Sequence, residues 1–452
     1  MSKQPASIFN DVIGPVMRGP SSSHVAAAVR IGKLGRQMVK GNLEEVIVKF
    51  DPNGSLATTY HGHGSDMGLV GGLLDYDPQD PRLPKALELV KEKGLGVSFH
   101  VVDYEADHPN TYKMTLISDK GERIETTSIS TGGGMIQYEE IEGFKVNIAG
   151  DFYESLIFIE DTQYAEKIIE QIKMSDYEID YCDQISKEGK ALINIKGSKA
   201  LDEKIVKEIK NNSGVVNVMC LSPVLPIMSR KNCEVPFINA EEMLKVAEKE
   251  NLKLWELATL YESHRGSISK EEVFEKMRQI VMLMDGSIES GLKGTSYEDR
   301  ILGPQAHLIE KKQREGKLIP GNVLNKVISF ITAMMEVKSA MGVIVAAPTA
   351  GSCGGLPGTT KELGLTIEDA TKGMLAAGMI GLFIADRVEV PCLGKNVMAG
   401  SNAIACANMV LAGYDKVIPL DETIESMYKV GKMLPSALRC TGYGGLSITK
   451  TA

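Results

Sequence analysis

The chain lacks any long uninterrupted apolar run. Among its 452 residues, the longest apolar stretches are 341–347 and 378–385, which have the length of buried core segments. A membrane-spanning helix needs roughly 20 such residues, so none is expected. The polar start, Met1 to Ala6, has no apolar signal-peptide region. The sequence therefore predicts a cytoplasmic protein without a membrane segment.

The chain also lacks a Cys-x-x-Cys pair, which argues against zinc-ribbon and thioredoxin-like sites. Acidic residues outnumber basic ones, and the formal net charge is −9. This charge argues against binding to nucleic acid or anionic membranes. The seven cysteines are expected to be thiols or metal ligands, because the cytosol is reducing. A hydrophobic content of 43% and a charged content of 24% are typical of a globular metabolic enzyme.

The pattern of predicted strands and helices changes twice along the chain. Residues 1–152 mix strands, helices and Gly-rich turns, which predicts an α+β N-terminal domain. Residues 153–226 alternate strands with two amphipathic helices, in the order of a small ferredoxin-like module. Residues 235–452 are almost wholly helical and predict an all-α C-terminal domain, including a long apolar helix over 320–346.

The segment Gly19-Pro-Ser-Ser-Ser-His24 stands directly ahead of a predicted helix. Ser21, Ser22 and Ser23, with the free amides of a helix start, form a natural site for an anion such as a substrate carboxylate. His24 beside them can move a proton near neutral pH. The residues alone leave a second interpretation open, in which the serines only cap the helix.

The loop Tyr60-His-Gly-His-Gly-Ser-Asp66 contains two histidines, His61 and His63. Their i,i+2 spacing without a clear third ligand is weak for zinc. An acid–base role is favoured over a metal site. A solvated loop without function is the alternative.

Two Gly- and Pro-rich segments interrupt the predicted C-terminal helices and carry Cys353 and Cys392. Irregular backbone between buried helices is costly unless its polar groups are used, so both segments are site candidates. Thiolates in such places can hold a metal or a cluster. Cys440 lies in a third Gly-rich segment, whereas Cys406, in an apolar helix, is expected to be a core residue.

Together and in order, these motifs resemble those of the iron–sulfur-dependent L-serine dehydratases. Five segments are similar to the β domain of that family: Gly19–His24, Gly62–Asp66, Val70–Leu74, His108–Thr111 and Gly132–Gly134. Four further elements are similar to its α domain: Ala347–Ser352, Val390–Cys392, Asn396 and Met427–Pro435. Residues 153–226 look like the ACT-type regulatory module of many members.

The resemblance implies L-serine ammonia-lyase chemistry. A 4Fe-4S cluster held by three cysteines binds the substrate hydroxyl through its open iron and acts as a Lewis acid. A base removes the α-proton, hydroxide leaves, and the enamine hydrolyses to pyruvate and ammonia. No pyridoxal phosphate is implied.

The resemblance also implies roles for individual residues. His24, His63 and Ser352 become catalytic candidates. The candidates for substrate contacts are Ser21, Ser22, Ser23, Thr349, Lys395 and Asn396. Cys392 becomes a cluster ligand. The family further implies a small amino-acid substrate and a homodimer.

The sequence departs from the family pattern just before Cys392. About fifty residues, roughly a helical hairpin, are missing there, and with them two cysteines that hold the cluster in family members. Lys395 stands where the family usually has arginine, so the planar fork of a guanidinium is lost.

Three hypotheses follow from this departure. Cys353, Cys392 and Cys440 rebuild a cluster site; or the protein performs a related elimination without a cluster; or it is a catalytically dead paralogue that binds an amino acid. Among enzymes, the alternative substrates are threonine, cysteine and a hydroxy-dicarboxylate.

Overall fold

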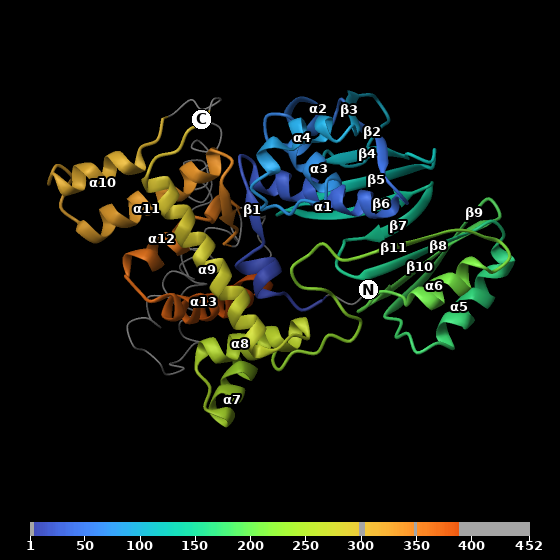
Figure 1. Ribbon diagram of the computed structural model, residues 1–452. Helices are drawn as coiled ribbons and strands as arrows, with labels where there is room; N and C mark the ends of the chain where they lie inside the picture. Colours follow the sequence, from blue (N-terminus) through green and yellow to red (C-terminus); the bar gives the residue numbers. More distant parts are fainter. Residues whose placement is uncertain (1–3, 298–302, 348–349, 388–452) are drawn as a thin grey trace. The chain divides into compact units, whose positions relative to one another are not determined.

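The computed structural model describes residues 4–297, 303–347 and 350–387, and the chain divides into two compact units (Figure 1). The first unit contains residues 23–232, and the second contains residues 3–22 together with the chain from Cys233 onward. Among the described helices, none has both the length and the apolar character needed to cross a membrane.

The first unit begins with a six-stranded sheet in the order β3-β2-β4-β5-β6-β7. Its strands are β2 (Leu43–Phe50), β3 (Gly96–Val101), β4 (Thr111–Ser118), β5 (Arg123–Gly132), β6 (Met135–Ile141) and β7 (Phe144–Ile148). β2 and β3 run parallel, and every other neighbouring pair is antiparallel. Val46, Val48 and Phe50 alternate along β2 and are all fully buried, which is the period-two pattern of a strand with one face in the core.

Helices accompany this sheet: α1 (Ser22–Met38), α2 (Leu56–Thr59), α3 (Ser65–Leu73) and α4 (Ala86–Glu92), the last preceded by the short turn η2 (Leu83–Lys85). α1 packs on the sheet through the buried Tyr138, whose hydroxyl donates to the Ile31 carbonyl at 2.6 Å. The α+β class predicted for this region is confirmed.

The rest of the first unit is a four-stranded antiparallel sheet with two helices. In chain order its elements are β8 (Tyr153–Ile159), the turn η3 (Thr162–Tyr164), α5 (Ala165–Lys173), β9 (Tyr181–Lys187), β10 (Lys190–Gly197), α6 (Glu203–Lys210) and β11 (Val215–Leu221). The spatial order β11-β8-β10-β9 is that of a ferredoxin-like βαββαβ module, which confirms the predicted fold. Its core joins Ile157 and Ile193 of the sheet to Ile168 of α5 and Ile209 of α6.

The second unit is helical, as predicted. Its helices are α7 (Ala240–Glu250), α8 (Leu254–Gly266), α9 (Lys270–Leu292), α10 (Ala306–Arg314), α11 (Asn322–Ser339), α12 (Gly355–Glu362) and α13 (Ile367–Arg387). Smaller elements complete the described part: η1 (Ile8–Val12), β1 (Val16–Arg18), β12 (Val343–Val345) and η4 (Ala350–Ser352).

The helix predicted over 320–346 is shorter than expected, because α11 ends at Ser339. Met341 has a left-handed φ of 57°, and the Gly342 amide donates back to the Val337 carbonyl at 2.7 Å. The β-branched residues that follow form β12, which pairs antiparallel with β1. This pairing was not predicted, since the partner strand lies more than 300 positions away in the chain.

Residues 4–22 belong to the helical unit by their contacts, although the predicted α+β domain spanned 1–152. The buried carboxylate of Glu262 on α8 accepts from the Ser7 hydroxyl at 2.5 Å and from the Ile8 amide at 2.8 Å. Tyr261 and Arg265, one residue before and three after, donate to the carbonyls of Ala6 at 3.0 Å and Pro5 at 2.6 Å. α8 therefore fastens the N-terminal segment.

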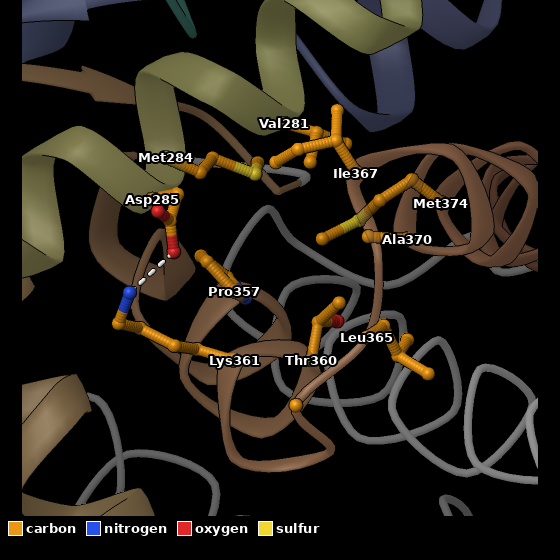
Figure 2. Close-up of a pocket in the computed structure, with 11 residues that line it drawn as sticks. Val281, Met284, Asp285, Pro357, Thr360, Lys361, Leu365, Ile367, Ala370 and Met374 are labelled. Carbon is orange, nitrogen blue, oxygen red and sulfur yellow. Dashed lines mark hydrogen bonds and ion pairs between the residues drawn. The ribbon is translucent and has the colours of Figure 1, made fainter.

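A cavity of about 270 Å³ opens in the second unit among α9, α12 and α13 (Figure 2). Met284 and Met374 line it together with Lys361. The ammonium of Lys361 lies 2.5 Å from Asp285 and 3.3 Å from Glu289, so its charge is already balanced. None of the described residues predicted for the site lines this cavity.

Replacing Glu262 with glutamine tests the N-terminal attachment. Burial raises the pKa of Glu262 to about 7, against the opposing effect of its bonds from Ser7 and Ile8. A carboxyl with a raised folded-state pKa contributes stability that is complete below its unfolded pKa, roughly 4.3, and is lost as the pH rises through the folded value. From about pH 5 to pH 8, the wild type should lose on the order of 3 kcal/mol relative to Glu262→Gln.

Urea unfolding across that pH range measures this difference. Burial also raises the pKa of Glu154 to about 7, but Glu154 is present in both proteins and cancels. A difference that stays constant with pH would show that Glu262 keeps its charge.

Candidate active site

The N-terminus of α1 begins at Ser22, inside the serine-rich motif predicted to bind an anion. Ser22 is 0% exposed, and its hydroxyl has no hydrogen-bond partner among the described residues. Ser21, Ser23 and His24 are half-buried around it. A 17-residue helix places the positive end of its dipole at this point, so the motif has the chemistry of an anion site.

His24 and His63 come together, as their predicted shared role requires. Their rings stack with centroids 4.2 Å apart and planes inclined by 20°. The Nδ1 atom of His63 lies 3.1 Å from the hydroxyl of Ser65, which holds the ring. Both histidines are half-buried.

His61, the second histidine of the loop, has a different environment. Its side chain is 80% exposed, and its Nδ1 lies 2.6 Å from the carboxylate of Asp66. Asp66 is 4% exposed and also accepts from the Met67 amide at 2.7 Å. The structure therefore distinguishes His63, which stacks on His24, from His61, which Asp66 holds at the surface.

Glycines bring α1 and α3 close enough for the histidine rings to meet. A Cβ at Gly72 would lie 2.1 Å from the Val29 carbonyl oxygen, and one at Gly68 would lie 2.6 Å from that of Val25. Both distances are shorter than any real Cβ contact, so the two helix backbones touch. His24 directly precedes Val25, so this crossing sets its distance from the loop that carries His63.

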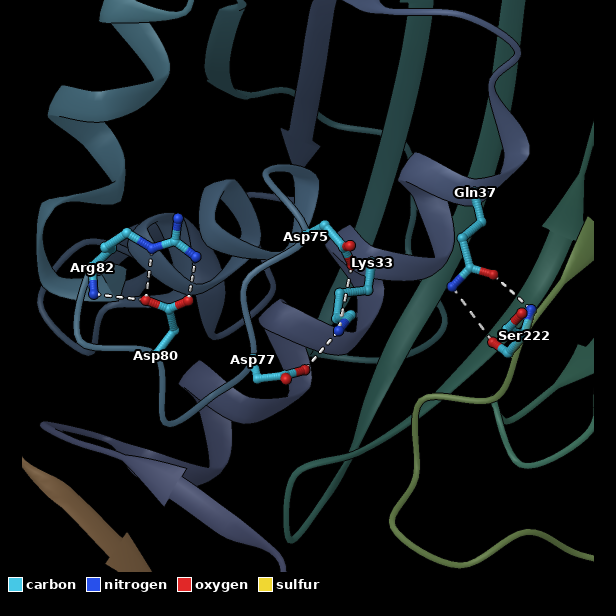
Figure 3. Close-up of polar contacts among 7 residues, drawn as sticks. All are labelled: Lys33, Gln37, Asp75, Asp77, Asp80, Arg82 and Ser222. Carbon is cyan, nitrogen blue, oxygen red and sulfur yellow. Dashed lines mark hydrogen bonds and ion pairs between the residues drawn. The ribbon is translucent and has the colours of Figure 1, made fainter.

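Polar contacts hold the C-terminal half of α1 (Figure 3). The ammonium of Lys33 lies 2.6 Å from Asp77 and 3.4 Å from Asp75, in the segment after α3. Gln37 accepts from the Ser222 amide at 2.6 Å and donates to its carbonyl at 3.5 Å. α1 is thus tied to the chain after α3 and to the chain after β11.

Arg30 was not predicted from the sequence. It is 3% exposed, donates to the Gly134 carbonyl, and its Nε has no partner among the described residues. Burial lowers its pKa to about 10. It thereby holds the β5–β6 hairpin, where Gly132, Gly133 and Gly134 all adopt positive φ. Its helix also carries Lys33 and Arg36, so no sequence pattern set Arg30 apart as the buried cation.

The second unit carries the other described part of the predicted site. The hydroxyl of Ser352, in η4, donates to the Ala347 carbonyl at 2.7 Å. Lys338, fully buried on α11, donates to the Ala350 carbonyl at 2.8 Å. Gly19 lies so close to Lys338 that a Cβ would be 1.7 Å from its carbonyl oxygen. Lys338, which the sequence did not single out, therefore contacts both the turn at Gly19 and the turn at Ala350.

Of the predicted metal ligands, the structure describes Cys353. It is 0% exposed, and its Sγ lies 3.7 Å from the sulfur of Met335. Within residues 4–297, 303–347 and 350–387, no three His, Cys, Asp or Glu side chains gather as a metal site. The described residues therefore include one of the three predicted ligands and no complete metal site. The other predictions, Thr349, Cys392, Lys395, Asn396 and Cys440, lie outside the described residues.

The α1–α3 crossing predicts a strong effect of Gly72→Ala. The added Cβ meets backbone rather than a movable side chain, so the helices must separate at a cost of about 2 kcal/mol. Hydrogen exchange of α1 and α3 amides should become roughly thirtyfold faster. Gly96→Ala is the control, since its Cβ would lie 3.5 Å from its nearest neighbour. Equal exchange in both variants would contradict the close crossing.

Comparisons with known proteins cover most of the chain. Residues 10–141 match the family model for the serine dehydratase beta chain, and residues 249–388 and 384–447 match that for the alpha chain. A probable L-serine dehydratase beta chain of Bacillus subtilis is 45% identical over 155 residues, covering 34% of this chain and 69% of that protein. The L-serine dehydratase of Haemophilus influenzae is 23% identical over 509 positions, covering 95% of this chain and 96% of the relative.

The alpha-chain comparisons confirm the missing segment. The probable alpha chain of Bacillus subtilis is 28% identical over 277 positions, covering 92% of that protein but 48% of this chain's 452 residues, which is about 217. About 60 aligned positions, 277 less 217, therefore lack a counterpart here. The alpha-chain match is itself in two parts that meet at residues 384–388. The chain thus belongs to the L-serine dehydratase family, with beta-chain and alpha-chain regions in one polypeptide and a shortened alpha-chain region.

Proposed function

We propose that this protein is a lyase that converts L-serine to pyruvate and ammonia. The observation that carries the proposal is the stack of His24 on His63, with His24 in the first turn of α1, next to the unpartnered hydroxyl of Ser22. The names of the relatives support L-serine as the substrate.

In this proposal the substrate carboxylate binds at the N-terminus of α1. The buried hydroxyl of Ser22 lacks a partner, and such a group costs free energy until a ligand accepts its hydrogen bond. Ser21 and Ser23 flank it, and the first-turn amides add further donors. A carboxylate can accept hydrogen bonds from all of these donors at once. Its binding would therefore explain why a hydroxyl is buried at Ser22.

The histidine pair then moves the protons. One imidazole takes the α-proton, and its stacked neighbour stabilises the product of that transfer. Loss of the α-proton and of hydroxide leaves 2-aminoacrylate. Its imine form takes up one water and releases ammonia and pyruvate, so no net water is consumed.

The family is typically iron–sulfur dependent, and a cluster would supply a Lewis acid for the departing hydroxyl. Of the three candidate ligands the structure describes Cys353, so every step is assigned to side chains that the structure describes. The proposal retains Cys353, Cys392 and Cys440 as candidate ligands. It also retains Thr349, Ser352, Lys395 and Asn396 as the substrate contacts of the alpha-chain region.

We also propose that the protein acts in the cytoplasm as a homodimer. The separate beta and alpha chains of Bacillus subtilis support the idea that these two regions work together. Size-exclusion chromatography with light scattering tests the dimer, and a monomer at micromolar concentration would contradict it.

Asparagine in place of either stacked histidine tests the acid–base assignment. His24→Asn and His63→Asn should each lower kcat/KM for L-serine by about a hundredfold or more, since a positioned general base contributes at least that much. His100→Asn is the control, because this histidine is exposed on β3 beside Ser98. Pyruvate formation measures all three. Losses of equal size in the control, or no loss in either stacked variant, would contradict the assignment.

Cys392→Ala tests the ligand assignment. Protein purified without oxygen and reconstituted with iron and sulfide should release pyruvate from L-serine, and the variant should lose both pyruvate release and bound iron. Cys220→Ala, at an exposed position on β11, should keep both. Pyruvate release unchanged in Cys392→Ala would favour elimination without this ligand. No release from the wild type would favour another substrate or an amino-acid-binding role.

A further inference from the structure

The loop that carries His63 rests on an aromatic cluster of the six-stranded sheet. The ring centroid of Tyr60, at the start of this loop, lies 5.0 Å from that of Phe50 and 5.3 Å from that of Phe99. Phe50 in turn meets Tyr112 of β4 edge to face, with centroids 5.4 Å apart. All of these residues belong to the first unit. Tyr112 is therefore part of the aromatic support beneath the histidine loop.

Backbone hydrogen bonds fix the chain on both sides of this support. The amide of Ser55, ahead of α2, donates to the Pro109 carbonyl at 2.8 Å, close to the start of β4. The amide of Ser65, at the start of α3, donates to the Tyr60 carbonyl at 2.8 Å and closes the histidine loop. These bonds set the position of Ser65 relative to the beginning of β4, where Tyr112 lies.

The hydroxyl of Tyr112 is buried near that of Ser65. Both residues are 0% exposed. The phenol forms no hydrogen bond with a described residue, although the Ser65 hydroxyl is near enough to affect its ionisation. Burial raises the pKa of Tyr112 to about 12, the Ser65 hydroxyl opposes that rise, and the charge of Asp66 adds to it. The phenol is therefore neutral near pH 7.

A buried hydroxyl without a partner costs free energy, so its presence at Tyr112 needs a physical reason. A phenylalanine would pack against Phe50 without that cost. Ser65 supplies a reason, because its hydroxyl already lies 3.1 Å from Nδ1 of His63. A serine hydroxyl accepts and donates hydrogen bonds at the same time. Ser65 can therefore connect the imidazole of His63 to the phenol of Tyr112.

We propose that Tyr112 and Ser65 are positioning residues that hold His63 in the tautomer with a free Nε2. Nδ1–H of His63 donates to Oγ of Ser65, and the Ser65 hydroxyl donates to the phenol oxygen of Tyr112. The hydrogen bond at one ring nitrogen of a histidine decides which nitrogen carries the proton, so Nε2 keeps its lone pair.

The free Nε2 has a definite role in the proposed function, on which this part of the assignment rests. It takes the α-proton of L-serine and forms the new N–H bond. The electron pair of the broken C–H bond forms the carbon–carbon double bond, and hydroxide leaves. His63 is then the base of the stacked pair.

Histidine-selective ¹⁵N labelling of the full chain tests the tautomer by NMR. At about pH 8.5, above the ordinary histidine pKa of roughly 6.5, wild-type His63 should carry its proton on Nδ1. Ser65→Ala and Tyr112→Phe should each move the ring towards a mixture of tautomers, because each breaks the hydrogen-bond chain. His63→Asn assigns the signals. A wild-type proton on Nε2, or an unchanged tautomer in either variant, overturns the proposal.

Pyruvate formation separates positioning from substrate binding. Tyr112→Phe should lower kcat for L-serine about tenfold, which is the effect of about one hydrogen bond, and should leave KM within about twofold. The double variant Ser65→Ala/Tyr112→Phe should lose no more than Ser65→Ala alone, because the two residues act through one hydrogen-bond chain. Losses that multiply, or a raised KM with an unchanged kcat, overturn the proposal.

Tyr138→Phe is the matched control. Tyr138 is also a fully buried tyrosine of this sheet, but its hydroxyl donates to the Ile31 carbonyl at 2.6 Å. This variant should lose stability with that bond and keep the wild-type tautomer of His63. A changed tautomer in Tyr138→Phe would show that loosened packing moves the ring, and it would overturn the proposal. If no protein, wild type included, forms pyruvate from L-serine, the proposed function fails, and the tautomers still decide the role of Tyr112.

Discussion

The close crossing of α1 and α3 is the constraint on which the candidate site depends. Because Gly68 and Gly72 carry no Cβ, the helix backbones approach within the distance that a side chain would occupy. That approach places His24 of α1 against His63 of the loop before α3, with ring centroids 4.2 Å apart. The serine-rich N-terminus of α1 is positioned by the same helix, so the anion site and the proton-transfer pair share one support.

Several features were open to prediction because they are local. The serine-rich helix start, the loop with His63 and the ferredoxin-like order all follow from residue patterns of a few to some tens of positions. Arg30 and Lys338 were not predictable in this way. Each is a buried cation on a helix that also carries other cations, and each donates to a carbonyl oxygen, that of Gly134 or Ala350, which only the fold brings close.

The N-terminal segment shows the same limit. Its residues look like the beginning of the α+β region, yet Glu262 and Tyr261 on α8 hold it in the helical unit, and β1 pairs with β12. Which strand β1 pairs with depends on tertiary packing across this long sequence separation. Local hydrophobic periodicity therefore does not predict the pairing. The missing segment before Cys392, in contrast, could be predicted from the sequence. It is a gap between two motifs whose spacing in the family is longer, and the alpha-chain comparisons confirm it.

The most direct test is to observe the two histidines while L-serine binds. Imidazole ring signals can be recorded by NMR in protein labelled at histidine, and His24→Asn and His63→Asn assign them. We predict that L-serine shifts the signals of His24 and His63 and leaves that of His100 unchanged. Such shifts require neither turnover nor a cluster. Saturating L-serine that leaves both stacked histidines unshifted would contradict a substrate site at the N-terminus of α1.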